Sequence, residues 1–356
     1  MWPKVSIIWL NYNSSKIMPI VLKSLESIIS LDYPFDKFEL IVVDNGSNDG
    51  SFERIKEFLQ KEIVFRKKII RLRKNLGFTG GNNIGFKARD KDSKYVLLLN
   101  NDAILFQSGL KTLVEYAESN SNLACLQGVV LKYGTRLIDT AGNFIDELLW
   151  SYLLGHSREY PWILRKPLYV TYVSGSCALY RVESVVRYLG NKLFINEFFG
   201  YGDDNVFGLI MWNHGCKSVA IPEAVASHAG SLTFGKKNAF STYLVDRNRI
   251  ALTLITNTRY KNIMPFYMLN CTLRDFAGSI LRMRYEDYTQ TRIKAMIDGI
   301  KLAKKLRSRG ILIDIYKAPI IKIPSKYMSA SFIARRLAAK YFENWDVKIL
   351  SSLTVD

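Results

Sequence analysis

The sequence is poor in cysteine and histidine, with four cysteines and three histidines among 356 residues. The cysteines lie at least 39 residues apart, without the Cys-x-x-Cys spacing of zinc or redox sites, so we expect buried free thiols. An uncharged apolar stretch of about 18 residues is also missing, as is a basic leader followed by an apolar core. We therefore expect a cytoplasmic protein without a membrane-spanning helix, either soluble or peripheral on the cytoplasmic face of a membrane.

Acidic residues are few relative to basic ones, 32 against 50, which gives a net charge of +18. The excess lies near the C-terminus, because residues 236–356 hold 23 basic and 9 acidic residues, whereas residues 1–235 hold 27 and 23. The hydrophobic content of 48% and aromatic content of 13% exclude a disordered or fibrous chain. The positive net charge is therefore informative about binding partners and not about the fold.

Two common phosphate-binding patterns are absent. The glycine-rich stretch from Asn75 to Gly85 lacks the Lys-Ser/Thr pair of a P-loop and the spacing of the dinucleotide fingerprint. This excludes the usual nucleotide loops of P-loop kinases and dehydrogenases. Because the stretch contains so many glycines, we expect its backbone to be exposed to a phosphate or base rather than structured by packing.

From Val5 to Pro222, short apolar runs alternate with segments of helical period. This pattern predicts an α/β fold, a mostly parallel wound sheet with helices on both faces. The expected strands cover residues 5–10, 40–44, 69–72, 95–99, 170–180 (interrupted at 174–176) and 217–221, and a short helix is expected over 203–212. Later helices are longer and basic, and are expected over 243–256, 264–283 and 287–308. We place the boundary between an α/β domain (1–235) and a mainly helical, basic region (236–356) at this change of pattern.

Polar side chains follow the ends of several predicted strands. Asn11, Asp44, the stretch beginning at Asn75 and Asp102 all stand where an apolar run stops. Ligands of open α/β sheets bind outside the carboxyl ends of the strands, so we expect these groups at one rim. Asp44 can accept hydrogen bonds from a nucleoside or close an Asx turn. Asp102 can bind Mg²⁺ or Mn²⁺ on a diphosphate or act as a cap.

Two further features concern acid-base or metal chemistry. Adjacent carboxylates, Asp203 and Asp204, precede an apolar helix, where they either favour the helix dipole or provide a general base. His228 stands near Gly230 at the same expected rim, so it either completes a metal site with Asp102 or is a structural histidine.

In combination these motifs resemble the family 2 glycosyltransferases of GT-A fold, and most of all their rhamnosyltransferase-like branch. The likeness runs from about Val5 to about Asn257, and its motifs are residues 5–13, 41–50, 75–85, 97–102, 175–181 and 198–204, with His228. The resemblance implies transfer of a sugar from a nucleotide-diphosphate donor to a hydroxyl, with inversion at the anomeric carbon.

The resemblance also implies roles for individual residues. Asp102 ends a motif that is usually Asp-x-Asp and here reads Asn100-Asn101-Asp102, so Asp102 with His228 would hold Mg²⁺ or Mn²⁺. Gly175 and Ser176 would line the acceptor or donor-sugar side. The nucleotide would be bound by Asn11, Asn13, Asp44, Asn75, Gly77 and Asn101.

The family's catalytic base lies in a Gly-Glu-Asp-x-Asp-Leu segment, which is matched here by residues 202–207. Asp204 is then the base, and Asp203 replaces the family's glutamate. Val206 replaces the later acid, which implies an acceptor preference unlike that of relatives. Asp246-Arg247-Asn248-Arg249 matches an Arg-Asn-Arg stretch that often follows the catalytic domain.

The expected partners are a UDP-, dTDP- or GDP-linked sugar and a glycan or lipid-linked glycan acceptor. The basic C-terminal helices either lie on an anionic membrane surface or present a solvated face, and a Lys-rich thermophile surface would also account for part of the charge. Two alternatives stay open. One is a nucleic-acid-binding protein with a vestigial nucleotide site, although no binding motif is present. The other is a nucleotidyltransferase, although a basic triphosphate loop is missing.

Overall fold

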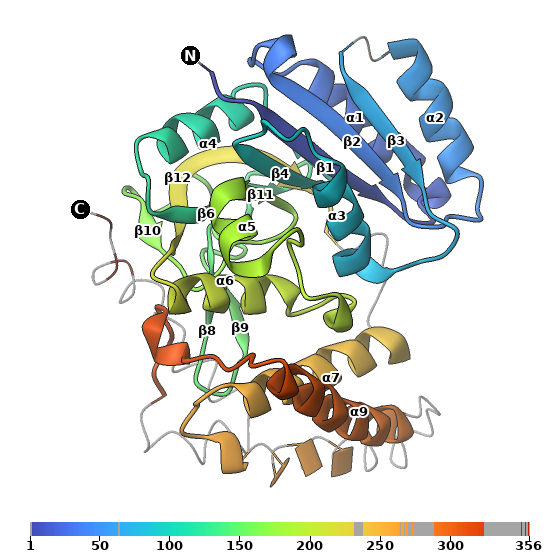
Figure 1. Cartoon of the computed structure of the whole chain (residues 1–356). Helices are drawn as coiled ribbons and strands as arrows, with labels where there is room; N and C mark the ends of the chain where they lie inside the picture. Colours follow the sequence, from blue (N-terminus) through green and yellow to red (C-terminus); the bar gives the residue numbers. More distant parts are fainter. Residues whose placement is uncertain are drawn as a thin grey trace.

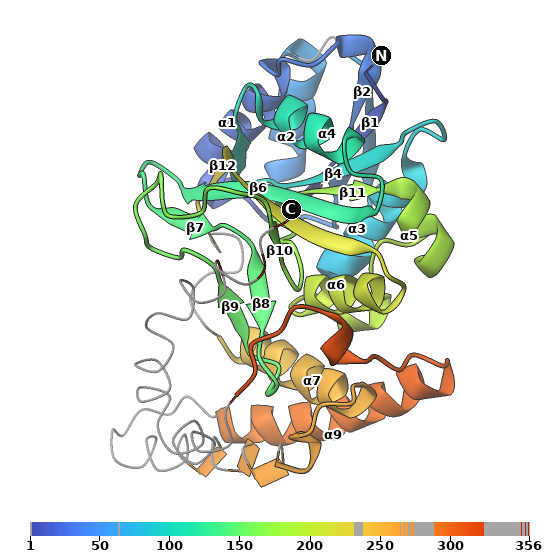
Figure 2. The same cartoon turned by 90° about the vertical axis from the view of Figure 1, so that its left-hand side faces the viewer.

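The computed structural model describes residues 2–62, 65–230, 238–263 and 288–323, with isolated positions at 265–273 and 350–355. These residues form a large mixed sheet covered by helices, with a helical region beside it (Figures 1 and 2). The strands are β1 (Val5–Asn11), β2 (Phe38–Asp44), β3 (Lys67–Arg71), β4 (Tyr95–Asn100), β5 (Ala103–Leu105), β6 (Leu123–Lys132), β7 (Ile138–Thr140), β8 (Asn143–Ile145), β9 (Ser151–Leu153), β10 (Leu168–Tyr169), β11 (Cys177–Arg181) and β12 (Lys217–His228). The helices are α1 (Met18–Ile29), α2 (Ser51–Glu62), α3 (Gly77–Ala88), α4 (Gly109–Glu118), α5 (Val182–Leu189), α6 (Asp203–Asn213), α7 (Ala239–Ile255) and α9 (Tyr288–Ser308).

One half of the sheet is parallel, in the order β3-β2-β1-β4. The four strands predicted there are confirmed to within two residues at each end. The register places Asn11 beside Asp44 and Leu10 beside Asn100, so the strands end together. The polar groups at these ends therefore share one rim, as predicted.

The other half of the sheet has both parallel and antiparallel strands, and its last strand ends at the same rim. β11 pairs antiparallel with β4 and β6, and β12 runs parallel to β6. The last strand is longer than the predicted 217–221, because register shifts between Ala220 and Ala226 accommodate Pro222, which lacks a backbone N–H. β12 therefore continues to His228, which pairs with Ala103 next to Asp102.

Alternate residues of each strand point to opposite faces of the sheet, and each face has its own core. Trp9 packs with residues of α1, α2 and α4, whereas Ile8 packs with residues of α3, α5 and α6. Helices thus cover both faces, and the predicted α/β class is confirmed.

The glycine-rich stretch is a helix, so our expectation of an exposed backbone was wrong. Gly81 and Gly85 stand four residues apart and therefore lie on one side of α3, the side that faces β1. A Cβ atom on Gly81 would lie 2.4 Å from Leu10 Cδ1, and one on Gly85 would lie 2.5 Å from Ile8 Cγ2. The glycines therefore allow α3 to lie directly on β1, and packing does account for them.

The strand predicted over 170–180, with its interruption at 174–176, is confirmed after the interruption and is wrong before it. β10 ends at Tyr169 and β11 begins at Cys177, and the residues between them run against α6. A Cβ atom on Gly208 of α6 would lie 2.4 Å from the Thr171 carbonyl oxygen, which shows how closely this helix approaches the segment.

The helical region packs on the sheet domain. α7 and α9 confirm the helices predicted over 243–256 and 287–308, and the two helices lie side by side in both views (Figures 1 and 2). Leu252 and Leu306 join the same core cluster as Ile8. The helix expected over 264–283 falls largely outside the described residues, and so does the boundary at residue 235, so the two-domain division stays a prediction.

Three cysteines lie in the described part of the chain and are free thiols, with Cys125 and Cys177 buried and Cys216 half-buried. This agrees with the predicted buried thiols, while Cys271 lies outside the described residues. None of the described helices has the length and apolar character needed to cross a bilayer.

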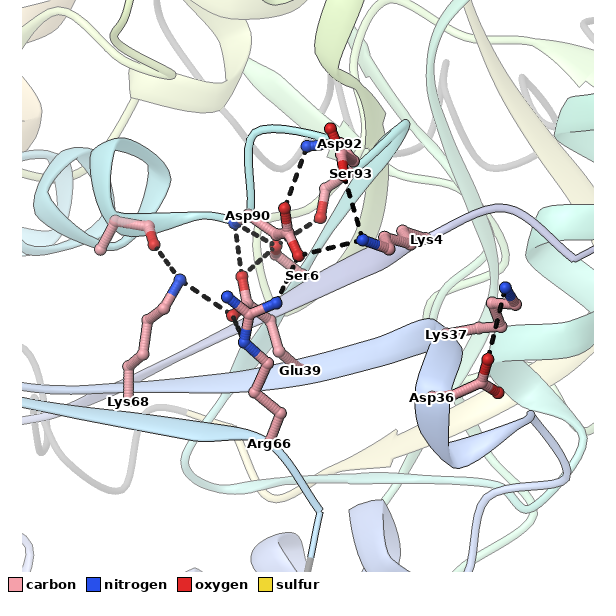
Figure 3. Close-up of polar contacts among 11 residues, drawn as sticks. Lys4, Ser6, Asp36, Lys37, Glu39, Arg66, Lys68, Asp90, Asp92 and Ser93 are labelled. Atoms are coloured by element: carbon pink, nitrogen blue, oxygen red, sulfur yellow. Dashed lines mark hydrogen bonds and ion pairs between the residues drawn. The ribbon is translucent and has the colours of Figure 1, made fainter.

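The amino ends of the parallel strands hold a network of paired charges (Figure 3). Glu39 is buried, accepts a hydrogen bond of 2.7 Å from Ser6 Oγ and lies 2.9 Å from Lys68 Nζ. Asp90 accepts from Arg66 at 2.5 Å and lies 3.5 Å from Lys4 Nζ. Carboxylates at this end of the sheet therefore have cationic partners.

Candidate active site

A cleft of about 350 Å³ opens at the carboxyl ends of β1 and β4. Its walls come from the start of α3, the segment before β11, the start of α6 and the end of β12. Three carboxylates and one imidazole line it, those of Asp102, Asp203, Asp204 and His228. Within the described part of the chain, its lining includes neither lysine nor arginine.

His228 and Asp102 meet at one side of this cleft. His228 Nε2 lies 3.1 Å from Asp102 Oδ1 but is buried and makes no hydrogen bond with a described residue. The other ring nitrogen, Nδ1, lies 3.0 Å from Asp139 Oδ2. Burial by itself would lower the pKa of His228, but the Asp102 and Asp139 carboxylates outweigh burial and raise it to about 9.

These two residues fit a divalent cation. A buried ring nitrogen without a hydrogen-bond partner and a carboxylate oxygen point to one place, about 3 Å apart, as adjacent ligands do on an octahedral ion with bonds of about 2.1 Å. The described residues hold no cluster of three or more His, Cys, Asp or Glu side chains suited to a metal. An ion here would therefore take its remaining ligands from water or a phosphorylated substrate.

Asp203 and Asp204 begin α6 on another wall of the cleft. Asp203 is 5% exposed, and burial together with the neighbouring Asp204 charge raises its pKa well above the usual range. Burial also raises the pKa of Asp204, to about 6, against the effect of the Asn205 and Gly175 N–H groups, which favour its charged form. Both carboxyl groups therefore hold a proton more readily than an exposed aspartate does.

The residues predicted to bind the nucleotide occupy three different places. Asn75 and Asn101 line the cleft. Asn11 and Asp44 are fully buried behind it, where Asn11 Nδ2 donates to Asp44 Oδ1 at 2.8 Å and Asn11 Oδ1 accepts from Asn101 at 3.2 Å. Neither Asn13 nor Gly77 is part of the lining: Asn13 accepts from the Asn48 N–H, and Gly77 lies against Phe199.

Gly175 and Ser176, predicted for the acceptor or sugar side, both line the cleft. The Gly175 N–H points toward Asp204, which places this segment beside the expected base. Val206 is buried in the core, so the position of the family's later acid is a packing position here.

A family model, "Glycosyl transferase family 2", matches residues 6–189, more than half of the chain. The chain belongs to this family. The resemblance stated from the motifs is thereby confirmed at the family level.

Two curated relatives match parts of this glycosyltransferase. The minor teichoic acid biosynthesis protein GgaB of Bacillus subtilis (strain 168) is 29% identical over 121 residues, which are 32% of this chain and 13% of the relative. The uncharacterized glycosyltransferase MJ1057 of Methanocaldococcus jannaschii is 29% identical over 148 residues, 41% of this chain and 46% of the relative. The match thus spans less than half of either relative's length.

Solved structures share the fold of this glycosyltransferase at low sequence identity. The mannosyltransferase PcManGT from Pyrobaculum calidifontis, in complex with GDP-Man and Mn²⁺, has a TM-score of 0.53 at 15% identity, covering 99% of this chain and 86% of that chain. TarS 1–349 of S. aureus, in complex with UDP-GlcNAc, has a TM-score of 0.53 at 17% identity, covering 87% and 84%. GalNAc-T7 with UDP, GalNAc and Mn²⁺ has a TM-score of 0.58 at 14% identity, covering 88% and 58%. The fold is GT-A, as predicted.

Several residues in the glycosyltransferase cleft, as well as Asp139, which contacts His228 but does not line the cleft, were missed at the level of sequence. Asp139 approaches His228 only because β7 pairs with β6 and β6 pairs with β12, and no motif marks it. Tyr12, Tyr172 and Tyr201 also line the cleft. Tyr12 could have been found, since it stands between Asn11 and Asn13 at the end of the first strand.

Proposed function

We propose that this protein is a metal-dependent, inverting glycosyltransferase that moves a sugar from a nucleotide diphosphate to a hydroxyl of a glycan or lipid-linked glycan. The observation that supports this most strongly is the charge of the cleft, which holds three carboxyl groups and, among its described residues, no lysine or arginine. A diphosphate would be repelled by such a site unless a divalent cation accompanied it.

Asp102 and His228 would hold that cation, Mg²⁺ or Mn²⁺, with Asp139 orienting the imidazole through Nδ1. When bound, the ion would neutralise the diphosphate and stabilise it as a leaving group. His228 must lose its Nε2 proton to serve as a ligand, so it would bind the ion in its neutral form.

Asp204 would act as the general base. Burial raises its pKa to about 6, so it is ionised at neutral pH and is still more basic than an exposed aspartate. As the acceptor oxygen bonds to the anomeric carbon, its proton passes to Asp204 and the bond from that carbon to the diphosphate oxygen breaks. A single displacement of this kind inverts the anomeric centre.

Asn75 and Asn101 would bind the nucleotide, while Asn11 and Asp44 hold Asn101 in place from behind. Asn13 and Gly77, which do not line the cleft, would contribute to nucleotide binding indirectly, through the conformation of the loops that contain them. Gly175 and Ser176 would line the sugar or acceptor side.

The donor would carry UDP, GDP or dTDP, and the solved structures with UDP-GlcNAc and GDP-Man support the first two. The transferred group would be a hexose or, as in the rhamnosyltransferase-like branch, a rhamnose.

We further propose that the enzyme binds a lipid-linked acceptor at the anionic cytoplasmic surface of a membrane. α9 exposes Ile293, Ile297 and Ile300 on one side, each 43–50% exposed, with Lys301 and Lys304 beside them. A face of this kind suits the interface of an acidic membrane. In a flotation assay the protein should float with phosphatidylglycerol vesicles and not with phosphatidylcholine vesicles; equal flotation with both, or with neither, would remove the membrane from this proposal.

The proposed reaction is tested by a thermal-shift panel of UDP, GDP, dTDP and their sugars, each with Mn²⁺, Mg²⁺ or EDTA. One nucleotide should raise the melting temperature, and only with the metal, because a ligand of the folded state stabilises it. The sugar linked to that nucleotide is then used for transfer, and NMR of the product should show an inverted anomeric centre. Retention, pyrophosphate release from a nucleoside triphosphate, or a salt-dependent nucleic-acid gel shift without transfer would each contradict the proposal.

A further inference from the structure

The loop that leads into α6, residues 197–202, has an unusual backbone. Phe199 and Tyr201 both have φ of 66°, and Gly202, the N-cap of α6, has φ of 78°. A left-handed conformation is unfavourable for aromatic residues, so the surrounding structure must hold this loop in place. Asp203 and Asp204 follow directly, and the conformation of the loop sets where their side chains point.

α3 holds one side of this loop. The Thr79 N–H donates to the Phe199 carbonyl at 3.2 Å. Gly77 makes the approach possible, because a Cβ atom there would lie 2.2 Å from the same carbonyl oxygen.

α7 holds the other side through one amide. Asn248 Nδ2 donates to the carbonyl oxygens of Phe198, Gly200 and Tyr201, at 3.0, 2.8 and 2.7 Å. The Asn248 side chain is buried, and its Oδ1 accepts from Arg247 Nε at 2.9 Å, which determines the orientation of the amide.

Arg247 adds two bonds to the same loop. Its Nη2 donates to the carbonyls of Glu197 and Phe198 at 3.0 and 2.7 Å. The two residues together satisfy the carbonyls of Glu197, Gly200 and Tyr201, and they also bond the Phe198 carbonyl, which accepts from the Gly200 N–H as well.

We propose that Asn248 is a positioning residue for the transfer reaction: its amide holds the 197–202 loop so that the Asp204 carboxylate faces the cleft. This inference rests on the proposed role of Asp204 as the base. It assigns a function to the Arg-Asn pair of α7, which lies outside the cleft and belongs to the helical region. Part of the catalytic geometry is thus set by a helix that contributes no lining residue within the described chain.

A matched control stands at the other end of α6. Asn213 Nδ2 donates to the carbonyls of Leu209 and Asp314, at 2.8 and 2.9 Å, and its Oδ1 accepts from the Asp314 N–H. The two asparagines therefore make similar backbone bonds, but only Asn248 contacts the 197–202 loop.

The experiment compares full-length Asn248→Ala, Asn213→Ala and wild-type protein by transfer kinetics, nucleotide binding and hydrogen exchange of the loop amides. Asn248→Ala should lower kcat about 10- to 100-fold, since a displaced catalytic group can cost about a hundredfold. It should leave the nucleotide Kd within about twofold and speed exchange across residues 197–204. Asn213→Ala should leave both kcat and loop exchange unchanged even where it lowers the melting temperature.

Wild-type kcat in Asn248→Ala, or an equal loss of kcat in Asn213→Ala, overturns the inference. Should Asn248→Ala fail to fold, Arg247→Ala removes two bonds to the same loop from a less buried position, and it should show a smaller effect of the same kind. Failure of the proposed function gives a different result: Asp204→Asn then retains full turnover, while hydrogen exchange still reports whether Asn248 holds the loop.

Discussion

The carboxylates at the two ends of the parallel strands differ in whether they have cationic partners. At the amino ends, Glu39 and Asp90 lie within 2.5–3.5 Å of Arg66, Lys68 and Lys4 (Figure 3). At the carboxyl ends, Asp203 and Asp204 form no ion pair with any described lysine or arginine, and the Asp102 carboxylate lies 3.1 Å from the imidazole of His228 and forms no ion pair with a described lysine or arginine.

This difference indicates that the carboxylates at the amino ends have a structural role and that those in the cleft have a chemical one. At the amino ends each carboxylate has a cationic partner, and loss of that partner would leave an uncompensated charge that destabilises the fold. Unpaired carboxylates in a cleft cost stability and have perturbed proton affinities, which is typical of groups that bind or transfer charge. The charges at the amino ends of the strands are thus compensated by other side chains, whereas the carboxyl ends form the cleft in which a ligand can bind.

The sharpest test of this comparison is Asp204→Asn. Turnover should fall about 10²- to 10⁴-fold, because the acceptor proton loses its base, while nucleotide affinity stays the same. The melting temperature should rise, since a buried carboxylate is replaced by a neutral amide. Unaltered turnover would show that Asp204 is not the base.

Asp102→Ala should have the next largest effect. Without this carboxylate, the affinity for the nucleotide in the presence of Mn²⁺ should fall by about 10- to 100-fold, toward the value with EDTA. Titration calorimetry with and without chelator measures both values. If wild-type affinity is identical with Mn²⁺ and with EDTA, the metal site is refuted.

The pH dependence of kcat/KM offers a third test. At a saturating metal concentration, which keeps His228 unprotonated, the ionisation of Asp204 should control kcat/KM. The pKa of Asp204 is raised to about 6, so kcat/KM should be constant above this pH and fall about tenfold per unit below it. A wild-type profile whose acidic limb lies near pH 4 would place the base in a solvated environment instead.

Glu39→Gln should affect stability alone. It removes the carboxylate that faces Lys68 and Ser6 and should lower the free energy of unfolding by about 1–3 kcal/mol, as for a buried charged hydrogen bond. Denaturant titration measures this, and kcat should stay within about twofold of wild type. A large loss of kcat would mean that the two ends of the sheet are coupled.

Much of the fold followed from local patterns in the chain. The strands ending at Asn11, Asp44 and Asn100 were predicted because continuous apolar runs stopped at turn residues. The prediction that Asp102, Asp204 and His228 reach a single cleft is confirmed, and their chemical roles remain predictions. The prediction failed for α3, where glycines were read as exposed backbone although they allow the helix to approach β1.

By itself the sequence determined the α/β class, the strand ends and the kinds of side chain that stand there, since periodicity and turn residues act over a few positions. Only the tertiary structure decided that Asp139 meets His228 across 89 positions of the chain and that Asn248 holds the loop before Asp204. The tertiary structure also decided which carboxylates have a lysine or arginine partner and which do not. Those properties depend on distance and on exclusion of water between segments far apart in the chain, and a linear pattern contains neither.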